Sequence, residues 1–278
     1  MTWRFLCVVM GILLTGADVA HGQDTDSTDS AVWEKVRTSL FADAQVETAD
    51  NVIALVTPKR AEDAAIVPVA IQSHFPQSKE RFIEKIWLIV DNNPSPIAAV
   101  FDFTLESGRA DIETRIRVEQ YTHVRAVALT SDGKLHMAVN YVKASGGCSA
   151  PAGKDALAAR ANLGKMRIRV DESPVPGQPA LAQLMISHPN DSGLAMDQVT
   201  RNYAPPHFVR QVKVSHAGKL VMSADVDFSI SENPNFRFYF VPDGGGQLEA
   251  KAIDNEDLEF ATTVSLGSGR GGRESALR

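Results

Sequence analysis

Cys148 is the residue with the clearest chemical potential in this chain of 278 residues. The only other cysteine, Cys7, lies in an apolar N-terminal run that is typical of a secretory signal. Removal of that signal leaves Cys148 as a single thiol, which has no internal disulfide partner in an oxidising compartment. A leftover cysteine of this kind indicates either pairing between molecules or a reactive thiol.

Small residues surround this cysteine, in the run GGCSAPAG over 146–153. Gly146 and Gly147 permit backbone conformations closed to other residues and shield a neighbouring sulfur poorly, so we interpret them as a flexible arm that exposes Cys148. Two other interpretations stay open, a small buried hydrophobic residue and an accidental linker cysteine. Three basic residues would lower the pKa of the thiol if they lie near it: Lys143, Lys154 and Arg160.

The N-terminus predicts export. Arg4 precedes an apolar run over 5–14, which is about half the length that a membrane span requires. The small residues at 20–22 offer a cleavage site, so we interpret 1–22 as a signal peptide that is removed. A retained anchor is the alternative. No other segment is apolar enough to span a membrane, and we expect no span in the mature chain.

Composition and motifs exclude several functional classes. The formal net charge of −6 gives no support to a nucleic-acid partner, which would favour a basic surface. The sequence contains no CxxC, HExxH, GxSxG or GxxxxGK[ST] motif, so it predicts no metal site, no cofactor and no catalytic set. We interpret His188 and His207, both beside prolines, as hydrogen-bonding turn residues rather than metal ligands.

Alternation of apolar and polar residues predicts strands along most of the chain. A stripe of Val32, Val36 and Leu40 predicts one helix over 31–43. Seven strands are expected before Cys148, over 51–57, 66–72, 83–90, 97–105, 112–118, 122–130 and 134–143. Seven more are expected after it, over 166–172, 181–188, 207–215, 219–226, 236–241, 247–253 and 258–264.

This pattern predicts an all-β fold with two immunoglobulin-like β-sandwich domains in tandem and a short N-terminal helix. A barrel remains an alternative for either half. The expected domains cover 31–145 and 165–264. A Gly/Ala-rich linker over 146–164 separates them, with a weak helix expected over 154–163, and a disordered tail over 265–278 follows.

Several ordered motifs resemble a known pair of families. The first half resembles SoxY through TPKRAEDAAIVPV at 57–69, NP at 93–94, TRIR at 114–117 and GGC at 146–148. The second half resembles SoxZ through KMRIR at 165–169, HPNDSG at 188–193, PPHF at 205–208 and SENP at 231–234. The arm reads GGCSA where SoxY-like chains have GGCGG, and it is tethered at both ends.

The chain resembles a fused SoxYZ-like carrier of the sort associated with quinoprotein dehydrogenases, and this resemblance implies a function. It implies a periplasmic protein, not an enzyme, that holds a sulfur intermediate covalently on Cys148, with Gly146 and Gly147 as its flexible arm. The implied partners are periplasmic enzymes of sulfur oxidation, for example of thiosulfate, or a quinoprotein dehydrogenase and its c-type cytochrome. No cofactor and no metal is implied.

Two alternatives to a carrier remain open at this point. The chain is alternatively a binding adaptor for a quinoprotein (PQQ) dehydrogenase or its cytochrome, with an incidental thiol, because immunoglobulin-like sandwiches are common interaction modules. A dimer joined by a Cys148–Cys148 disulfide is a third interpretation. The cargo, the oligomeric state and the pKa of Cys148 are not determined by the sequence.

Overall fold

The structure, a computed structural model, describes residues 28–150, 161–171, 174–196 and 201–267. Strands dominate this part of the chain, together with the helix α1 (Ala31–Phe41) and the 3-10 turn η1 (Leu105–Ser107). The first half contributes β1 (Val46–Thr48), β2 (Ile53–Val56), β3 (Val67–Ser73), β4 (Ile83–Val90), β5 (Ile97–Phe103), β6 (Ile112–Ile116), β7 (Thr122–Thr130) and β8 (Leu135–Val142). The second half contributes β9 (Met166–Val170), β10 (Ala180–Ile186), β11 (Val209–His216), β12 (Lys219–Val226), β13 (Asn235–Phe240), β14 (Gln247–Asp254) and β15 (Glu259–Ser265).

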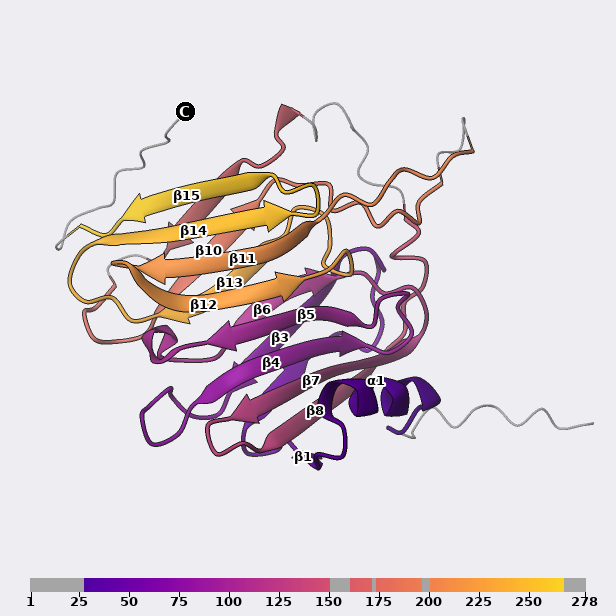
Figure 1. Cartoon of the computed structure of the whole chain (residues 1–278), viewed down its shortest axis with the longest axis horizontal. Helices are drawn as coiled ribbons and strands as arrows, with labels where there is room; N and C mark the ends of the chain where they lie inside the picture. Colours follow the sequence, from indigo (N-terminus) through magenta and orange to yellow (C-terminus); the bar gives the residue numbers. More distant parts are fainter. Residues whose placement is uncertain (1–27, 151–160, 172–173, 197–200, 268–278) are drawn as a thin grey trace, which may run out of the picture.

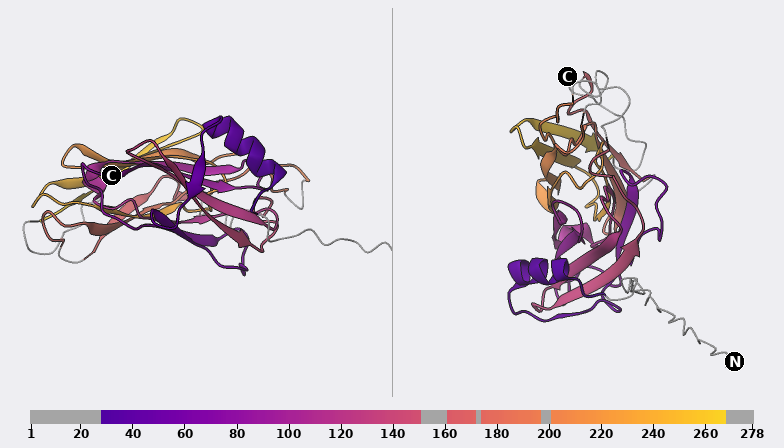
Figure 2. Two further views of the ribbon diagram at one scale, coloured as in Figure 1. Left: turned by 90° about the horizontal axis from the view of Figure 1, so that it is seen from below. Right: turned by 90° about the vertical axis from the view of Figure 1, so that its right-hand side faces the viewer.

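These strands form two sheets that face each other (Figures 1 and 2). The larger sheet has nine strands in the order β1-β8-β7-β4-β5-β12-β11-β14-β15. The smaller sheet has six strands in the order β2-β3-β6-β13-β10-β9. The predicted fold class, two immunoglobulin-like sandwiches in tandem with a short N-terminal helix, is confirmed.

The two halves join edge to edge in both sheets. In the larger sheet β5 pairs with β12, which places Phe101 opposite Ala224. In the smaller sheet β6 pairs with β13, which places Ile112 opposite Phe238. One hydrophobic core therefore runs through both halves, and the rings of Phe101 and Phe236 meet across the junction with centroids 6.3 Å apart.

Side-chain alternation explains why these segments form strands. In β13 the side chains of Phe236, Phe238 and Phe240 are buried, while Arg237 between them is exposed. In β6 the same period of two buries Ile112 and Ile116. A shift of pairing by one residue would move these apolar side chains to the solvent face, so burial fixes the register.

Helix α1 packs on the outer face of the nine-stranded sheet, beside β7 and β8 (Figure 1). Ser30 caps its N-terminus by accepting the backbone N–H of Trp33 at 2.9 Å. Trp33 and Phe41 pack with Ile89, Val127 and Leu135 in a second apolar cluster. The helix ends two residues before the predicted boundary, and Ala42 follows with a positive φ of 49°.

The predicted strands are recovered with small shifts at their ends. The short β1, which pairs in parallel with β8, was not predicted, because three residues carry too little periodicity. The predicted signal peptide over 1–22 lies outside the described residues. So do most of the weak helix over 154–163 and most of the tail over 265–278. In the part of the chain that the structure describes, no helix is long and apolar enough to cross a membrane.

Candidate functional site

Cys148 lies where the segment after β8 crosses the junction between the two halves. Its side chain is buried, with an exposed fraction of 0%. The preceding glycines run beside the chain that continues from β6. Gly146 donates its N–H to the Glu119 carbonyl at 2.8 Å, and Gly147 donates to the Val118 carbonyl at 2.9 Å. We call residues 143–150 the arm, and in this structure the arm is docked.

The Glu119 carboxylate holds the turn that contains Cys148. It accepts the backbone N–H of Cys148 at 2.8 Å and that of Ser149 at 3.1 Å. It also accepts the Ser149 hydroxyl at 3.0 Å. Hydrogen bonds to an ionised acceptor are stronger than those between neutral groups, so this one side chain is the main polar attachment of the arm.

The second half also contacts the arm. Ser192, in the loop after β10, donates its hydroxyl to the Cys148 carbonyl. Arg117 donates to the Gly147 carbonyl at 3.4 Å and to the Asn190 carbonyl at 3.1 Å, so its guanidinium joins the arm to that loop. Docking of Cys148 therefore depends on residues from both halves of the chain.

Asn93, in the turn between β4 and β5, fixes the segment on which the arm lies. Its side-chain amide donates to the Arg117 carbonyl at 2.8 Å and to the Ser229 hydroxyl at 3.0 Å. Its side-chain oxygen accepts the Glu119 N–H at 2.9 Å. Because Asn93 is buried, these bonds orient Arg117 and Glu119 toward the arm without competition from water.

The docked environment suppresses the nucleophilic form of the thiol. Burial raises the pKa of Cys148 to about 12, the neighbouring carboxylates of Glu119 and Asp227 add to this rise, and Arg117 opposes it. Burial in turn lowers the pKa of the Arg117 guanidinium. Since the thiolate is the reactive species, docked Cys148 is protonated and inert near neutral pH.

The expectation of an exposed thiol on Gly146 and Gly147 is wrong for this structure. The neighbours of Cys148 in sequence are small, but burial comes from residues distant in sequence. Gly147 itself is buried, and a Cβ there would overlap the carbonyl oxygen of Ala64. The glycine is thus required for close packing of the arm, a use of glycine that the sequence does not distinguish from flexibility.

The basic residues near Cys148 also differ from those expected. Lys154 and Arg160 lie outside the described residues, and Lys143 is exposed on the arm. The cation that does act on the thiol is Arg117, within the TRIR motif. Arg117, Glu119, Ser192 and Asn93 were not predicted as site residues. The only available signal was the presence of Arg117, Asn93 and Ser192 in motifs that carried the family resemblance.

His188 and His207 form a cluster that the sequence did not predict. Their Nε2 atoms lie 3.5 and 2.8 Å from Oδ2 of Asp254, and these three groups have the spacing of metal ligands. Nδ1 of His188, however, accepts the backbone N–H of Asn190 at 3.0 Å. The proton of the neutral ring therefore lies on Nε2, which offers a donor to Asp254 rather than a lone pair to a metal.

Family comparison agrees with the order of the two halves. Residues 37–148 match the family described as "Sulfur oxidation protein SoxY", and residues 168–265 match "Sulphur oxidation protein SoxZ". The chain is thus a two-domain sulfur-oxidation protein. It belongs to the SoxY family in its first half and to the SoxZ family in its second, fused in one SoxYZ-like chain. The SoxY match ends at Cys148 itself.

Solved structures give weaker likenesses. The sulfur carrier protein SoxY from Chlorobium limicola f thiosulfatophilum is 25% identical with a TM-score of 0.34, over 40% of this chain and 90% of that one. A superoxide reductase from Ignicoccus hospitalis is 13% identical with a TM-score of 0.31, over 40% of this chain and 86% of the other. Fibronectin(III)-like modules of Clostridium thermocellum CbhA are 12% identical with a TM-score of 0.22, over 77% and 92% of the two chains. These TM-scores are too low to assign a function, and a comparison with curated proteins gives no match.

Proposed function

We propose that this protein is a periplasmic carrier, not an enzyme, that holds a sulfur intermediate covalently on Cys148 while partner enzymes process it. The observation that carries the proposal is the position of Cys148. It is the last residue of the SoxY match, and the only cysteine in the part of the chain that the structure describes. The export signal expected over 1–22 supports the location.

The docked arm is the closed state of this carrier. Its polar attachments are backbone hydrogen bonds of Gly146 and Gly147 together with bonds to the side chains of Glu119, Ser192 and Arg117. Their loss exposes Cys148 and returns its pKa toward the ordinary value of 9.0. A carrier benefits from such a closed state, because a protonated, enclosed thiol does not react with other thiols and oxidants of the compartment.

Loading of the open state is an oxidation. When Cys148 joins the outer sulfur of thiosulfate, the S–H bond breaks and a sulfur–sulfur bond forms. One proton and two electrons leave, and a partner of the c-type cytochrome class accepts the electrons one at a time. The product keeps the sulfonate of thiosulfate at its outer end, where a hydrolase can act on it.

The modification state of Cys148 tests this function directly. Protein is taken from the periplasm without reductant, and the mass of the peptide that contains Cys148 is measured. We expect a fraction that carries added sulfur or thiosulfonate mass. We also expect Cys148→Ser to abolish growth on the sulfur substrate, while Ser149→Ala, which keeps the thiol, supports it. An unmodified thiol together with normal growth of Cys148→Ser would refute the carrier.

One observation favours a second candidate, an adaptor for a quinoprotein dehydrogenase or its cytochrome. Cys148 is fully buried and its pKa is about 12, as expected for an incidental structural thiol. In that case Cys148→Ser leaves both growth and capture of the dehydrogenase unchanged, and the thiol of the folded protein resists alkylation with or without its partners.

A further inference from the structure

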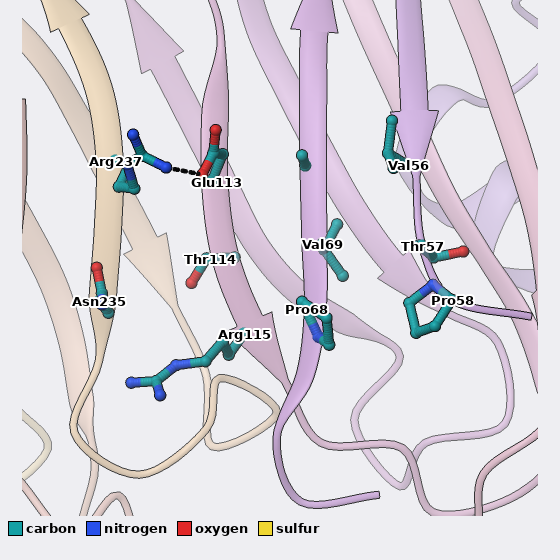
Figure 3. Close-up of a pocket in the computed structure, with 11 residues that line it drawn as sticks. Val56, Thr57, Pro58, Pro68, Val69, Glu113, Thr114, Arg115, Asn235 and Arg237 are labelled. Atoms are coloured by element: carbon teal, nitrogen blue, oxygen red, sulfur yellow. Dashed lines mark hydrogen bonds and ion pairs between the residues drawn. The ribbon is translucent and has the colours of Figure 1, made fainter. Parts of the chain in front are cut away.

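A basic groove lies next to the arm and shares with it only Lys143, the first residue of the arm. The groove occupies the outer face of the six-stranded sheet over β3, β6 and β13, with a volume of about 510 Å³ (Figure 3). A second hollow of about 700 Å³ lies between β2 and β8. Val56 and Thr57 line both, so the two hollows are adjacent, and we treat them as one surface. We call this surface the basic groove.

Charge distinguishes the basic groove from the rest of the chain. The formal net charge of the protein is −6. The cationic residues of the groove are Lys59, Arg60, Arg115, Lys143 and Arg237. The lining residues include one carboxylate, that of Glu113, which pairs with Arg237 at 2.8 Å. Glu62 and Asp63, in the adjacent loop, line neither hollow.

Arg115 retains donor capacity in the groove. It donates from Nη2 to the Asn233 carbonyl at 3.2 Å, while its buried Nε has no hydrogen-bond partner. The exposed end of the guanidinium, rather than the buried Nε, can donate to a carboxylate that enters the groove. Figure 3 shows the Arg115 side chain extending from β6 on the β13 side, with Pro68, Thr57 and Pro58 on the opposite side.

The rest of the lining combines polar residues, such as Thr57 and Asn235, with apolar ones. Val56 is 51% exposed, and Pro58, Pro68 and Val69 line the same hollow. A surface that combines exposed apolar side chains with guanidinium groups matches the side chains of a protein better than a uniformly charged polymer. It is also the composition in which arginine is enriched at protein interfaces.

The basic groove continues directly into the arm. Lys143, at the start of the arm, donates its N–H to the Lys59 carbonyl at 3.0 Å. Along the chain that leaves β6, Arg115 in the groove is followed two residues later by Arg117, which contacts the arm. A protein seated in the groove is therefore adjacent to Cys148 when the arm opens.

We propose that the basic groove is the docking surface for a partner protein that presents a carboxylate-rich segment with interspersed apolar side chains. The identification of that partner as one that acts on Cys148 rests on the proposed function, whereas the groove and its binding chemistry do not. Complementary charge accelerates association and selects the partner, and the apolar lining stabilises the complex.

The test uses the full chain with Cys148→Ser, so that thiol chemistry cannot contribute. The probe is a short fluorescein-labelled peptide in which glutamate alternates with leucine, and binding is followed by fluorescence anisotropy. We expect saturable binding that weakens as salt screens the charges. A matched peptide with glutamine in place of glutamate should bind at least roughly tenfold more weakly.

Substitutions test whether the peptide binds in the basic groove. Arg115→Gln combined with Arg237→Gln should weaken peptide binding at least roughly tenfold. Lys59→Gln with Lys143→Gln, at two exposed positions that do not endanger folding, should weaken it roughly three- to tenfold. Arg210→Gln is the matched control, because Arg210 also pairs with an exposed carboxylate, that of Asp257, but lies on β11 of the other sheet.

Three results would overturn the proposal. The first is an equal loss of affinity in Arg210→Gln and in both groove variants. The second is equal affinity for the glutamate and glutamine peptides. The third is displacement of the peptide by a single-stranded DNA of equal charge at equal concentration, which would mark a general polyanion surface. None of these results would bear on the covalent chemistry of Cys148.

Discussion

The docked arm predicts how fast Cys148 reacts with an alkylating agent, and why. The pKa of the docked thiol is about 12, compared with an ordinary value of 9.0. Near neutral pH this difference reduces the thiolate fraction roughly a thousandfold, which corresponds to about 4 kcal/mol. Direct alkylation of the docked thiol is therefore at most about a thousandth as fast as that of the unfolded chain, and any faster reaction must pass through an opened arm.

Substitution of Glu119 should increase this reaction. Glu119→Ala removes the acceptor of three hydrogen bonds that hold the turn at Cys148 and Ser149. With about 2 kcal/mol as the net contribution of these charge-assisted bonds, the opening equilibrium shifts roughly 30-fold toward the open arm. We expect iodoacetamide to alkylate Cys148 roughly 30-fold faster in this variant than in the native protein.

The assay measures the mass of the peptide that contains Cys148 over time, so Cys7 does not interfere. Protein in urea gives the rate of the exposed thiol, and Glu62→Ala, at an exposed carboxylate in the loop before β3, is the matched control. If the reaction passes through the open arm, its rate rises with pH and levels off near the ordinary pKa of 9.0. Alkylation of the native protein as fast as in urea would refute a docked thiol, and equal rates in the two variants would refute the role of Glu119.

Two further predictions concern packing and acid stability. Gly147→Ala should open the arm, because the added Cβ overlaps the Ala64 carbonyl, and should raise the alkylation rate of Cys148 at least as much as Glu119→Ala. Gly133→Ala is the control: an added Cβ there has nothing within 4 Å, so the alkylation rate should not change. Burial and His207 lower the pKa of His188 from 6.5 to about 4, so the unfolded chain takes up a proton first as pH falls through that window. The native protein should then lose about 3 kcal/mol of unfolding free energy. Urea titrations at both ends of the window should show that loss in the native protein and little of it in His188→Gln, and equal losses would refute the assignment to His188.

Most of the fold was predictable because each half carries its own local signal. The alternation in β6 and β13 identifies both strands and the faces that they bury. The pairing of β6 with β13 and of β5 with β12 was not predictable. The side chains of an edge strand show which face it buries, but not whether its free edge meets solvent or another strand. The union of the halves into two continuous sheets is therefore a finding of the structure.

The candidate site was likewise predictable only in part. The identity of the key residue, Cys148, follows from counting thiols and from the GGC motif. Its burial does not, because burial depends on contacts with Glu119, Arg117 and Ser192, which lie 29, 31 and 44 residues away along the chain. Small flanking residues are compatible both with a mobile arm and with an arm packed tightly against backbone, and only the position of the Ala64 carbonyl distinguishes the two.

The double attachment of the arm limits where Cys148 can go. Upstream, residues 143–148 connect it to the end of β8, and fully extended they reach about 20 Å. Downstream, residues 149–165 lead to β9 and allow more than twice that reach, so the upstream segment sets the limit. Beyond the protein surface the arm must travel as a doubled chain, which is wider than a free C-terminal tail. On the proposed carrier function, a partner that processes cargo on Cys148 needs a shallow or wide active-site entrance and must dock close to the arm, where the proposed docking groove lies.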